Sequence, residues 1–117
     1  MKKIEYSQIV RKKLNQLKVD LVQDFGAEVS KKSVKKITDA VRGLEKFEKK
    51  GIAVSVMYNI ECDYRYLYVS HNYVFYRIES EKIIIVEMFD EREDFMYKLF
   101  GISTRTQESI DYWGDED

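Results

Sequence analysis

Three runs of aromatic and branched residues in the second half of the chain constrain its fold most strongly. They are YRYLYV (64–69), YVFYRI (73–78) and IIIVEMF (83–89), and they are separated by SHN (70–72) and ESEK (79–82). Aromatic and β-branched residues favour strands, and short polar segments between such runs favour tight turns. The pattern therefore predicts an antiparallel meander of three strands.

A first helix is predicted ahead of the meander. Its apolar positions are spaced by four, three and four residues, which places them on one stripe of a helix; they are Val10, Leu14, Leu17 and Leu21. Ser7 is the expected N-cap, Phe25 extends the stripe, and Gly26 is the expected end.

A second helix is predicted from a similar stripe, which consists of Val34, Ile37, Val41 and Leu44 and continues to Phe47. Ser30 or Ser33 is the expected cap at its start, and Gly51 is expected to end it. The connection between the two helices is short, so they should form an antiparallel pair.

The remaining segments complete the prediction. Ile4 to Tyr6 forms a short edge strand, residues 52–58 form a loop or irregular strand, and a last helix runs from Asp90 to about Phe100, where Gly101 stops it. The predicted fold class is α+β: an N-terminal strand and a helical hairpin packed on an antiparallel sheet of three to four strands, then a C-terminal helix. Residues 1–101 are expected to form a single domain, and residues 102–117 an acidic tail that is either docked or flexible.

Composition narrows the functional classes. Cys62 is the only cysteine, which excludes an intrachain disulfide or a cysteine metal cluster, and no cofactor or metal is predicted. No apolar run approaches the length of a membrane span, and the N-terminus does not resemble a signal peptide, so a cytoplasmic protein without a membrane partner is expected. Residues 1–50 carry a formal charge of +7 and residues 51–117 carry −8. Attraction to nucleic acid would therefore have to come from the first half, although a solvated lysine face is the simpler interpretation.

The ordered set of motifs in residues 63–101, DYRYLYVSHNYVFYRIESEKIIIVEMFDEREDFMYKLFG, resembles the C-terminal sheet and helix of RelE/ParE-family toxins. With the preceding strand and hairpin, the resemblance covers most of residues 3–101. It implies a growth-arresting toxin of a bacterial type II toxin–antitoxin module, the class that includes mRNA interferases and plasmid-stabilization proteins. Its partners would be a cognate antitoxin and a target, which is either the ribosome with its mRNA or DNA gyrase.

The resemblance also carries over candidate catalytic residues. Arg65 falls on a strand position that is basic in the family's nucleases, and Arg92 falls on the arginine of the charged segment. Tyr97 or Lys98 lies near a position that is sometimes a catalytic tyrosine. The two arginines would hold the scissile phosphate, and Tyr97 or Lys98 would assist proton transfer.

The sequence departs from the nuclease pattern at several positions. Tyr73 or Val74 stands where the family has a sheet arginine, and Leu67 stands at a second basic position. Asp90, Glu91 and Glu93 surround Arg92 with charges that repel a polyanion. Three hypotheses therefore stay open: a ribosome-dependent mRNA endoribonuclease, a toxin that binds gyrase or another protein, and an inactivated member that only binds an antitoxin.

Most of the charge in 90–94 also has a structural interpretation. Asp90 and Glu93 have the spacing of an N-cap and the third helical residue, and acids in a first helical turn are favoured by the helix dipole. Arg65 could likewise be a surface residue of a half-buried strand, and Arg77 could pair with Glu79 or Glu87.

Overall fold

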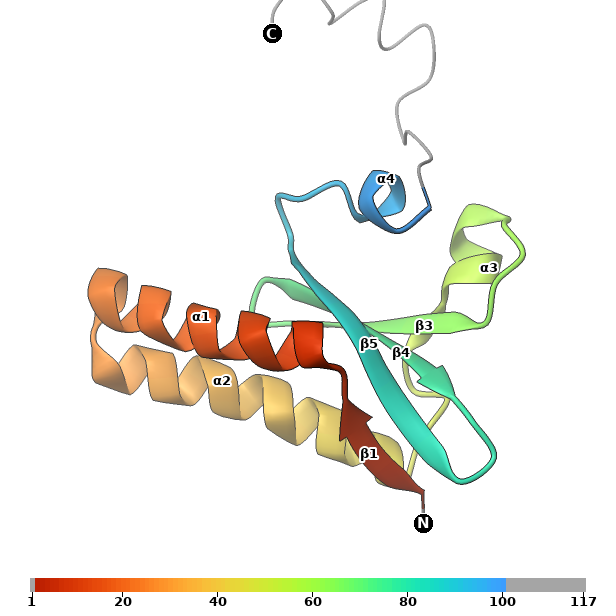
Figure 1. Ribbon diagram of the computed structural model, residues 1–117, viewed down its shortest axis with the longest axis horizontal. Coiled ribbons are helices and arrows are strands. Elements are labelled where there is room, and N and C mark those ends of the chain that lie inside the picture. Colours follow the sequence, from red (N-terminus) through yellow and green to blue (C-terminus); the bar gives the residue numbers. More distant parts are fainter. Residues whose placement is uncertain (1, 101–117) are drawn as a thin grey trace, which may run out of the picture.

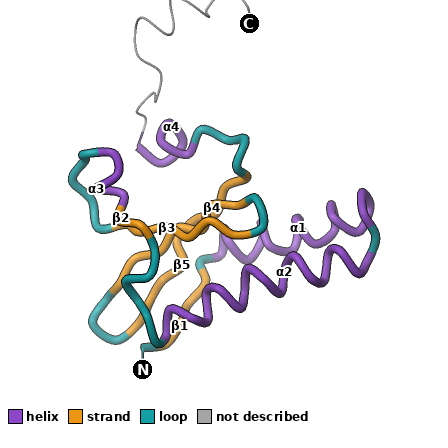
Figure 2. Tube along the Cα trace, turned by 180° about the vertical axis from the view of Figure 1, so that it is seen from behind, coloured by secondary structure: helices purple, strands orange, loops and turns teal. Residues whose placement is uncertain are grey.

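The protein consists of a helical hairpin on one face of a five-stranded sheet and two short helices on the other face (Figures 1 and 2). The computed structural model describes residues 2–100, except for the side chains of Met96, Tyr97 and Phe100. The elements are β1 (Lys3–Tyr6), α1 (Gln8–Phe25), α2 (Ala27–Arg42), η1 (Gly43–Glu45), β2 (Ile52–Ala53), α3 (Val54–Tyr58), β3 (Tyr64–Val69), β4 (Asn72–Ile78), β5 (Lys82–Asp90) and α4 (Phe95–Phe100).

The sheet has the order β1-β5-β4-β3-β2. The predicted meander corresponds to β3, β4 and β5, which pair antiparallel. The predicted α+β class is confirmed, but the sheet has five strands rather than three or four, and β1 pairs parallel with β5. The parallel pairing arises because the whole helical hairpin and three further strands separate the two strands in the chain, so no local turn defines their pairing.

The hairpin begins and turns at capping residues. The Ser7 hydroxyl accepts a hydrogen bond from the backbone N–H of Val10 at 3.2 Å, as expected for an N-cap. Gly26, with φ of +94°, ends α1 and also precedes α2, which begins at Ala27 rather than after Ser30 or Ser33. The buried Ser30 hydroxyl instead donates to the carbonyl of Lys18 at 2.8 Å and so joins the two helices.

The main core lies between the hairpin and the sheet. It is built from Val10, Ile37, Val41, Leu44, Leu67, Val74, Tyr76, Ile83, Ile85 and Met88. The two phenylalanines that were expected to extend the helical stripes lie outside it, because Phe25 and Phe47 are both 66% exposed. α1 runs past the end of the sheet before it reaches Phe25 (Figure 1), and α2 ends at Arg42, not at Gly51, so Phe47 is no longer on the helix.

A second apolar cluster covers the opposite face of the sheet and contains Val54, Tyr66, Phe75, Phe89 and Phe95. Residues 52–58, predicted as a loop or irregular strand, form β2 and α3. β2 forms because it pairs antiparallel with β3, Ile52 with Tyr66 and Ala53 with Arg65. Asn59, with φ of 54°, then ends α3 in the left-handed conformation.

The predicted helix start at Asp90 is wrong. The backbone N–H of Glu91 donates to the carbonyl of His71 at 2.9 Å, so β5 continues to Asp90. A turn follows, in which the N–H of Glu93 donates to the carbonyl of Asp90 at 2.9 Å, and α4 begins only at Phe95. A strand pairing across the sheet thus outweighs the local capping pattern of 90–93.

The start of α1 closes the edge of β5 where β1 ends. The Ser7 hydroxyl donates to the Val86 carbonyl at 3.1 Å. Six residues further along, Lys13 Nζ donates to the Met88 carbonyl at 2.8 Å. It also lies 2.7 Å from Glu87 Oε1 and 4.2 Å from the centre of the Phe89 ring. Since exposed strand edges invite unwanted pairing, these contacts protect β5 as well as fixing the hairpin on the sheet.

Candidate functional site

The turn between β3 and β4 forms one side of the candidate site. Ser70 and His71 have φ of 48° and 64°, the combination of a tight hairpin turn that matches the twist of its strands. The buried Asn72 donates from Nδ2 to the Ser70 carbonyl at 2.7 Å and holds the turn. This turn lies beside the end of β5, because Asn72 pairs with Asp90.

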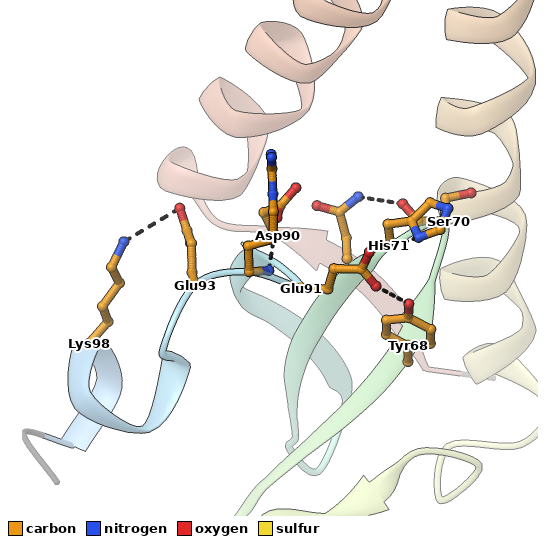
Figure 3. A network of polar contacts seen from close by, with 9 residues as sticks. Tyr68, Ser70, His71, Asp90, Glu91, Glu93 and Lys98 are labelled. Atoms are coloured by element: carbon orange, nitrogen blue, oxygen red, sulfur yellow. Dashed lines mark hydrogen bonds and ion pairs between the residues drawn. The ribbon is translucent and has the colours of Figure 1, made fainter. Parts of the chain in front are cut away.

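Glu91 connects this turn to the segment after β5 (Figure 3). Its carboxylate accepts a hydrogen bond from the Tyr68 hydroxyl and lies 3.0 Å from His71 Nδ1. That hydrogen bond to a carboxylate raises the pKa of Tyr68. Sequence reasoning placed Tyr68 on a strand and Glu91 in the first turn of a helix. Their contact depends on the pairing of β4 with β5.

Arg92 forms an ion pair with Asp90. Its backbone N–H and its Nε both donate to Asp90 Oδ1 at 2.9 Å, while 87% of its side chain is exposed. The hydrogen bonds from Arg92 lower the pKa of Asp90, and the same side-chain contact raises the pKa of Arg92. The guanidinium therefore lies on the surface with a carboxylate already against it.

The Arg65 side chain contacts the loop that precedes β2. Its Nη1 donates to the carbonyl of Gly51 at 2.8 Å and to that of Lys49 at 3.3 Å. Its neighbour Tyr76 holds the same loop: the Tyr76 hydroxyl donates to the Glu48 carbonyl at 2.7 Å and accepts from the Gly51 N–H at 2.9 Å. Gly51 itself fits tightly, since a Cβ there would lie 2.7 Å from the Tyr66 carbonyl oxygen.

Arg65 and Arg92 lie at opposite ends of the sheet. Arg65 pairs with Tyr76 near the start of β3, whereas Arg92 follows Asp90, which is level with the far end of β3 at Val69. Four residues of strand, roughly 13 Å, separate the two levels. The structure therefore does not bring the two arginines together around one phosphate.

The other two candidates are on α4. The Lys98 Nζ lies 3.4 Å from Glu93 Oε1. Tyr97 belongs to the same helix, but its side chain lies outside the described part of the structure, as do the predicted stop at Gly101 and the acidic tail 102–117. Arg77, which was expected to pair with Glu79 or Glu87, pairs with Glu79 at 2.8 Å.

A cleft of about 600 Å³ opens between the outer half of α1 and this end of the sheet. It is lined by Leu17, Asp20, Leu21, Gln23, Asp24, Phe25, Ser33, Ser70, His71, Asn72, Asp90, Glu91 and Arg92. Sequence analysis did not identify it, because its two walls meet only through the fold. Within residues 2–100, no group of three or more His, Cys, Asp or Glu side chains is arranged to hold a metal ion. No helix in the same residues is long and apolar enough to cross a membrane.

Comparison with known proteins agrees with this fold. Residues 4–95 match the family of the ParE toxin of the type II toxin–antitoxin system parDE. A chain from the chromosomal ParDE TA system from P. aeruginosa has a similar structure, with a TM-score of 0.64 and 18% sequence identity over 77% of this chain and 96% of that chain. No curated protein matches the sequence. Because the family match spans most of the chain, this protein belongs to the ParE toxin family of type II toxin–antitoxin systems.

Proposed function

We propose that this toxin arrests growth by binding a protein target, DNA gyrase, rather than by cleaving mRNA. Family membership supports the toxin role and implies a cognate antitoxin as partner. The choice between mechanisms is carried by one observation, the separation of Arg65 from Arg92 along the sheet. RNA cleavage needs several groups around one phosphate, where they stabilise charge that develops in the transition state.

The contacts of the two arginines support the same choice. Arg65 donates from Nη1 to two backbone carbonyls, which fixes its guanidinium at the loop of residues 49–51, away from Arg92. Arg92 has Asp90 against it, and Glu91 follows on the same turn. Carboxylates at this distance from a guanidinium lower its attraction for a phosphate.

The decisive experiment combines two measurements on the same protein. Purified toxin is added to a gyrase supercoiling assay, and transcript 5′ ends are mapped after induction in cells. We expect inhibition of supercoiling and no new transcript ends. New ends that depend on translation, without inhibition of gyrase, would refute the proposal in favour of ribosome-dependent mRNA cleavage.

Arg92→Gln provides the matched variant, with Arg11→Gln as control, because both arginines are exposed and Arg11 lies on α1 outside the cleft. In a nuclease that used Arg92, removal of a charge-stabilising donor would lower cleavage by about 10²-fold or more. A soluble, folded wild-type protein that binds its antitoxin but neither arrests growth nor affects gyrase would indicate the third hypothesis, an inactivated member.

A further inference from the structure

We propose that the cleft between α1 and the β3–β4 turn binds a basic, amphipathic segment of the antitoxin. The identity of the partner rests on the proposed function, whereas the chemistry of the segment follows from the two walls of the cleft. The α1 wall carries an apolar stripe with Asp20 and Asp24 beside it. The opposite wall carries two further acids, Asp90 at the end of β5 and Glu91 after it.

The apolar stripe of α1 continues beyond the core. Val10, near the start of α1, is 1% exposed, Leu17 and Leu21 are half-buried, and Phe25 at the end is 66% exposed. The burial falls because the hairpin runs past the edge of the sheet (Figure 1). A large aromatic side chain at the exposed end of such a stripe is typical of a protein-binding surface rather than of a core.

The exposed end of this stripe is too large for a small ligand to cover. Leu17 and Leu21 are half-buried, and Phe25 is mostly exposed. A small polar ligand would leave Phe25 in water, whereas an amphipathic helix could cover the stripe in successive turns. The spacing of Leu17, Leu21 and Phe25 is one helical turn, and a partner helix with the same repeat can pack against it.

The charges that line the cleft indicate the sign of the charge that a partner should carry. Asp20 and Asp24 lie on α1 beside the apolar stripe, are exposed, and make no ion pair within residues 2–100. Asp20 accepts a hydrogen bond from Gln16 Nε2 at 2.8 Å, which is a neutral donor. Arg92, the cation on the opposite wall, is already held by Asp90. A lysine or arginine next to the apolar residues of the partner would therefore meet complementary charge.

The direct test uses two synthetic helical peptides of about 16 residues that share one leucine stripe and differ only in arginine or glutamate beside it. Amide shifts of the isotope-labelled full chain are followed by NMR during titration. We expect the arginine peptide to shift amides of residues 17–25 and 70–72 and to bind about tenfold or more tightly than the glutamate peptide. Equal binding of the two peptides, or shifts confined to other surfaces, would overturn the proposal.

Two matched pairs of variants locate the site with the arginine peptide as probe. Phe25→Ala is compared with Phe47→Ala, since both phenylalanines are 66% exposed and only Phe25 lines the cleft. Asp24→Lys is compared with Glu28→Lys, because Glu28 is also exposed but lies outside the cleft. We expect each cleft variant to bind about tenfold more weakly and each control to bind as the wild type does. Equal effects within a pair would refute the site.

Competition separates this inference from the proposed function. The antitoxin encoded beside the toxin should displace the arginine peptide from the wild-type chain. Failure to displace it, in a toxin that the antitoxin neutralises, would overturn the assignment of the cleft to the antitoxin and leave the toxin function intact. Conversely, a wild-type chain that causes no growth arrest would refute the proposed function, while the peptide titrations would still decide the chemistry of the cleft.

Discussion

Tyr76→Phe tests whether the hydroxyl of Tyr76 holds the loop that leads into β2. Tyr76 is fully buried and makes two hydrogen bonds through one oxygen, to the Glu48 carbonyl at 2.7 Å and from the Gly51 N–H at 2.9 Å. The substitution keeps the ring in place and removes only this oxygen. Both backbone groups then lose the Tyr76 hydroxyl as a hydrogen-bond partner, and Gly51 is itself buried.

The expected cost follows from the environment of the two groups. A buried N–H left without an acceptor costs about 1–3 kcal/mol, and loss of a hydrogen bond to a carbonyl that water can reach costs about 1 kcal/mol. We therefore expect the free energy of unfolding to fall by about 2–4 kcal/mol. For a domain of this size, that corresponds to a decrease in Tm of about 8–16 °C.

Urea denaturation and calorimetry of the full chain measure this change. Tyr68→Phe is the control, because the Tyr68 hydroxyl also makes a hydrogen bond, to Glu91, but Tyr68 is 53% exposed. Water can replace that hydrogen bond, so the free energy of unfolding of the control should fall by less than about 1 kcal/mol. If Tyr76→Phe were destabilised no more than Tyr68→Phe, the loop would not depend on the buried hydroxyl and the reasoning would fail.

Two further predictions concern charged groups. Lys13→Met leaves Glu87, whose side chain is 16% exposed, without its cation, and it removes the Lys13 donor from the Met88 carbonyl. Urea denaturation should show a free energy of unfolding lower by about 1–3 kcal/mol. A change below about 0.5 kcal/mol would contradict the role of Lys13 at the β5 edge. The hydrogen bonds from Arg92 lower the pKa of Asp90 below its ordinary value of 3.8, so this interaction stabilises the fold above that pH and is lost as the pH falls through the lowered pKa. Asp90→Asn should therefore cost less than about 1 kcal/mol near pH 7, since the pair is exposed, and the difference from the wild type should vanish in strong acid; a difference that grew on acidification would show the opposite sign.

Local sequence patterns predicted the elements whose signals are local. The apolar stripe of α1, the Ser7 cap and the Gly26 end are determined within one helix, and the aromatic runs of the meander are joined by tight turns. Gly26 was correctly read as an end, but its second role as the start of α2 was missed. A glycine at φ of +94° allows one helix to follow another with no intervening loop, and sequence spacing alone does not reveal this.

Elements that depend on distant pairing were not predictable in this way. β2 forms because two residues meet β3, and β5 extends to Asp90 because the N–H of Glu91 bonds the carbonyl of His71. The candidate site illustrates the same limit. Arg65 could be placed on a strand from the sequence, but its acceptors are carbonyls in a loop 14 and 16 residues earlier, and no local motif indicates them.

The role of Arg65 can be decided by a double-mutant cycle with Tyr76. Both side chains hold the loop before β2, Arg65 through the Gly51 and Lys49 carbonyls and Tyr76 through Glu48 and Gly51. Once either is lost, the loop should loosen and the other should contribute less, so Arg65→Met and Tyr76→Phe together should cost less than the sum of their single effects. We expect a coupling of about 0.5–1.5 kcal/mol from urea denaturation of the four proteins.

The same cycle bears on function. Additivity within about 0.5 kcal/mol would mean that Arg65 does not act through the loop. A loss of growth arrest by Arg65→Met at a temperature where the variant is fully folded would then place its guanidinium on the functional surface, as the nuclease hypothesis requires. If instead the coupling is present, and growth arrest declines only in proportion to the folded fraction, Arg65 acts by fixing the backbone of residues 49–51. The nuclease hypothesis would then lose one of the two arginines assigned to the phosphate.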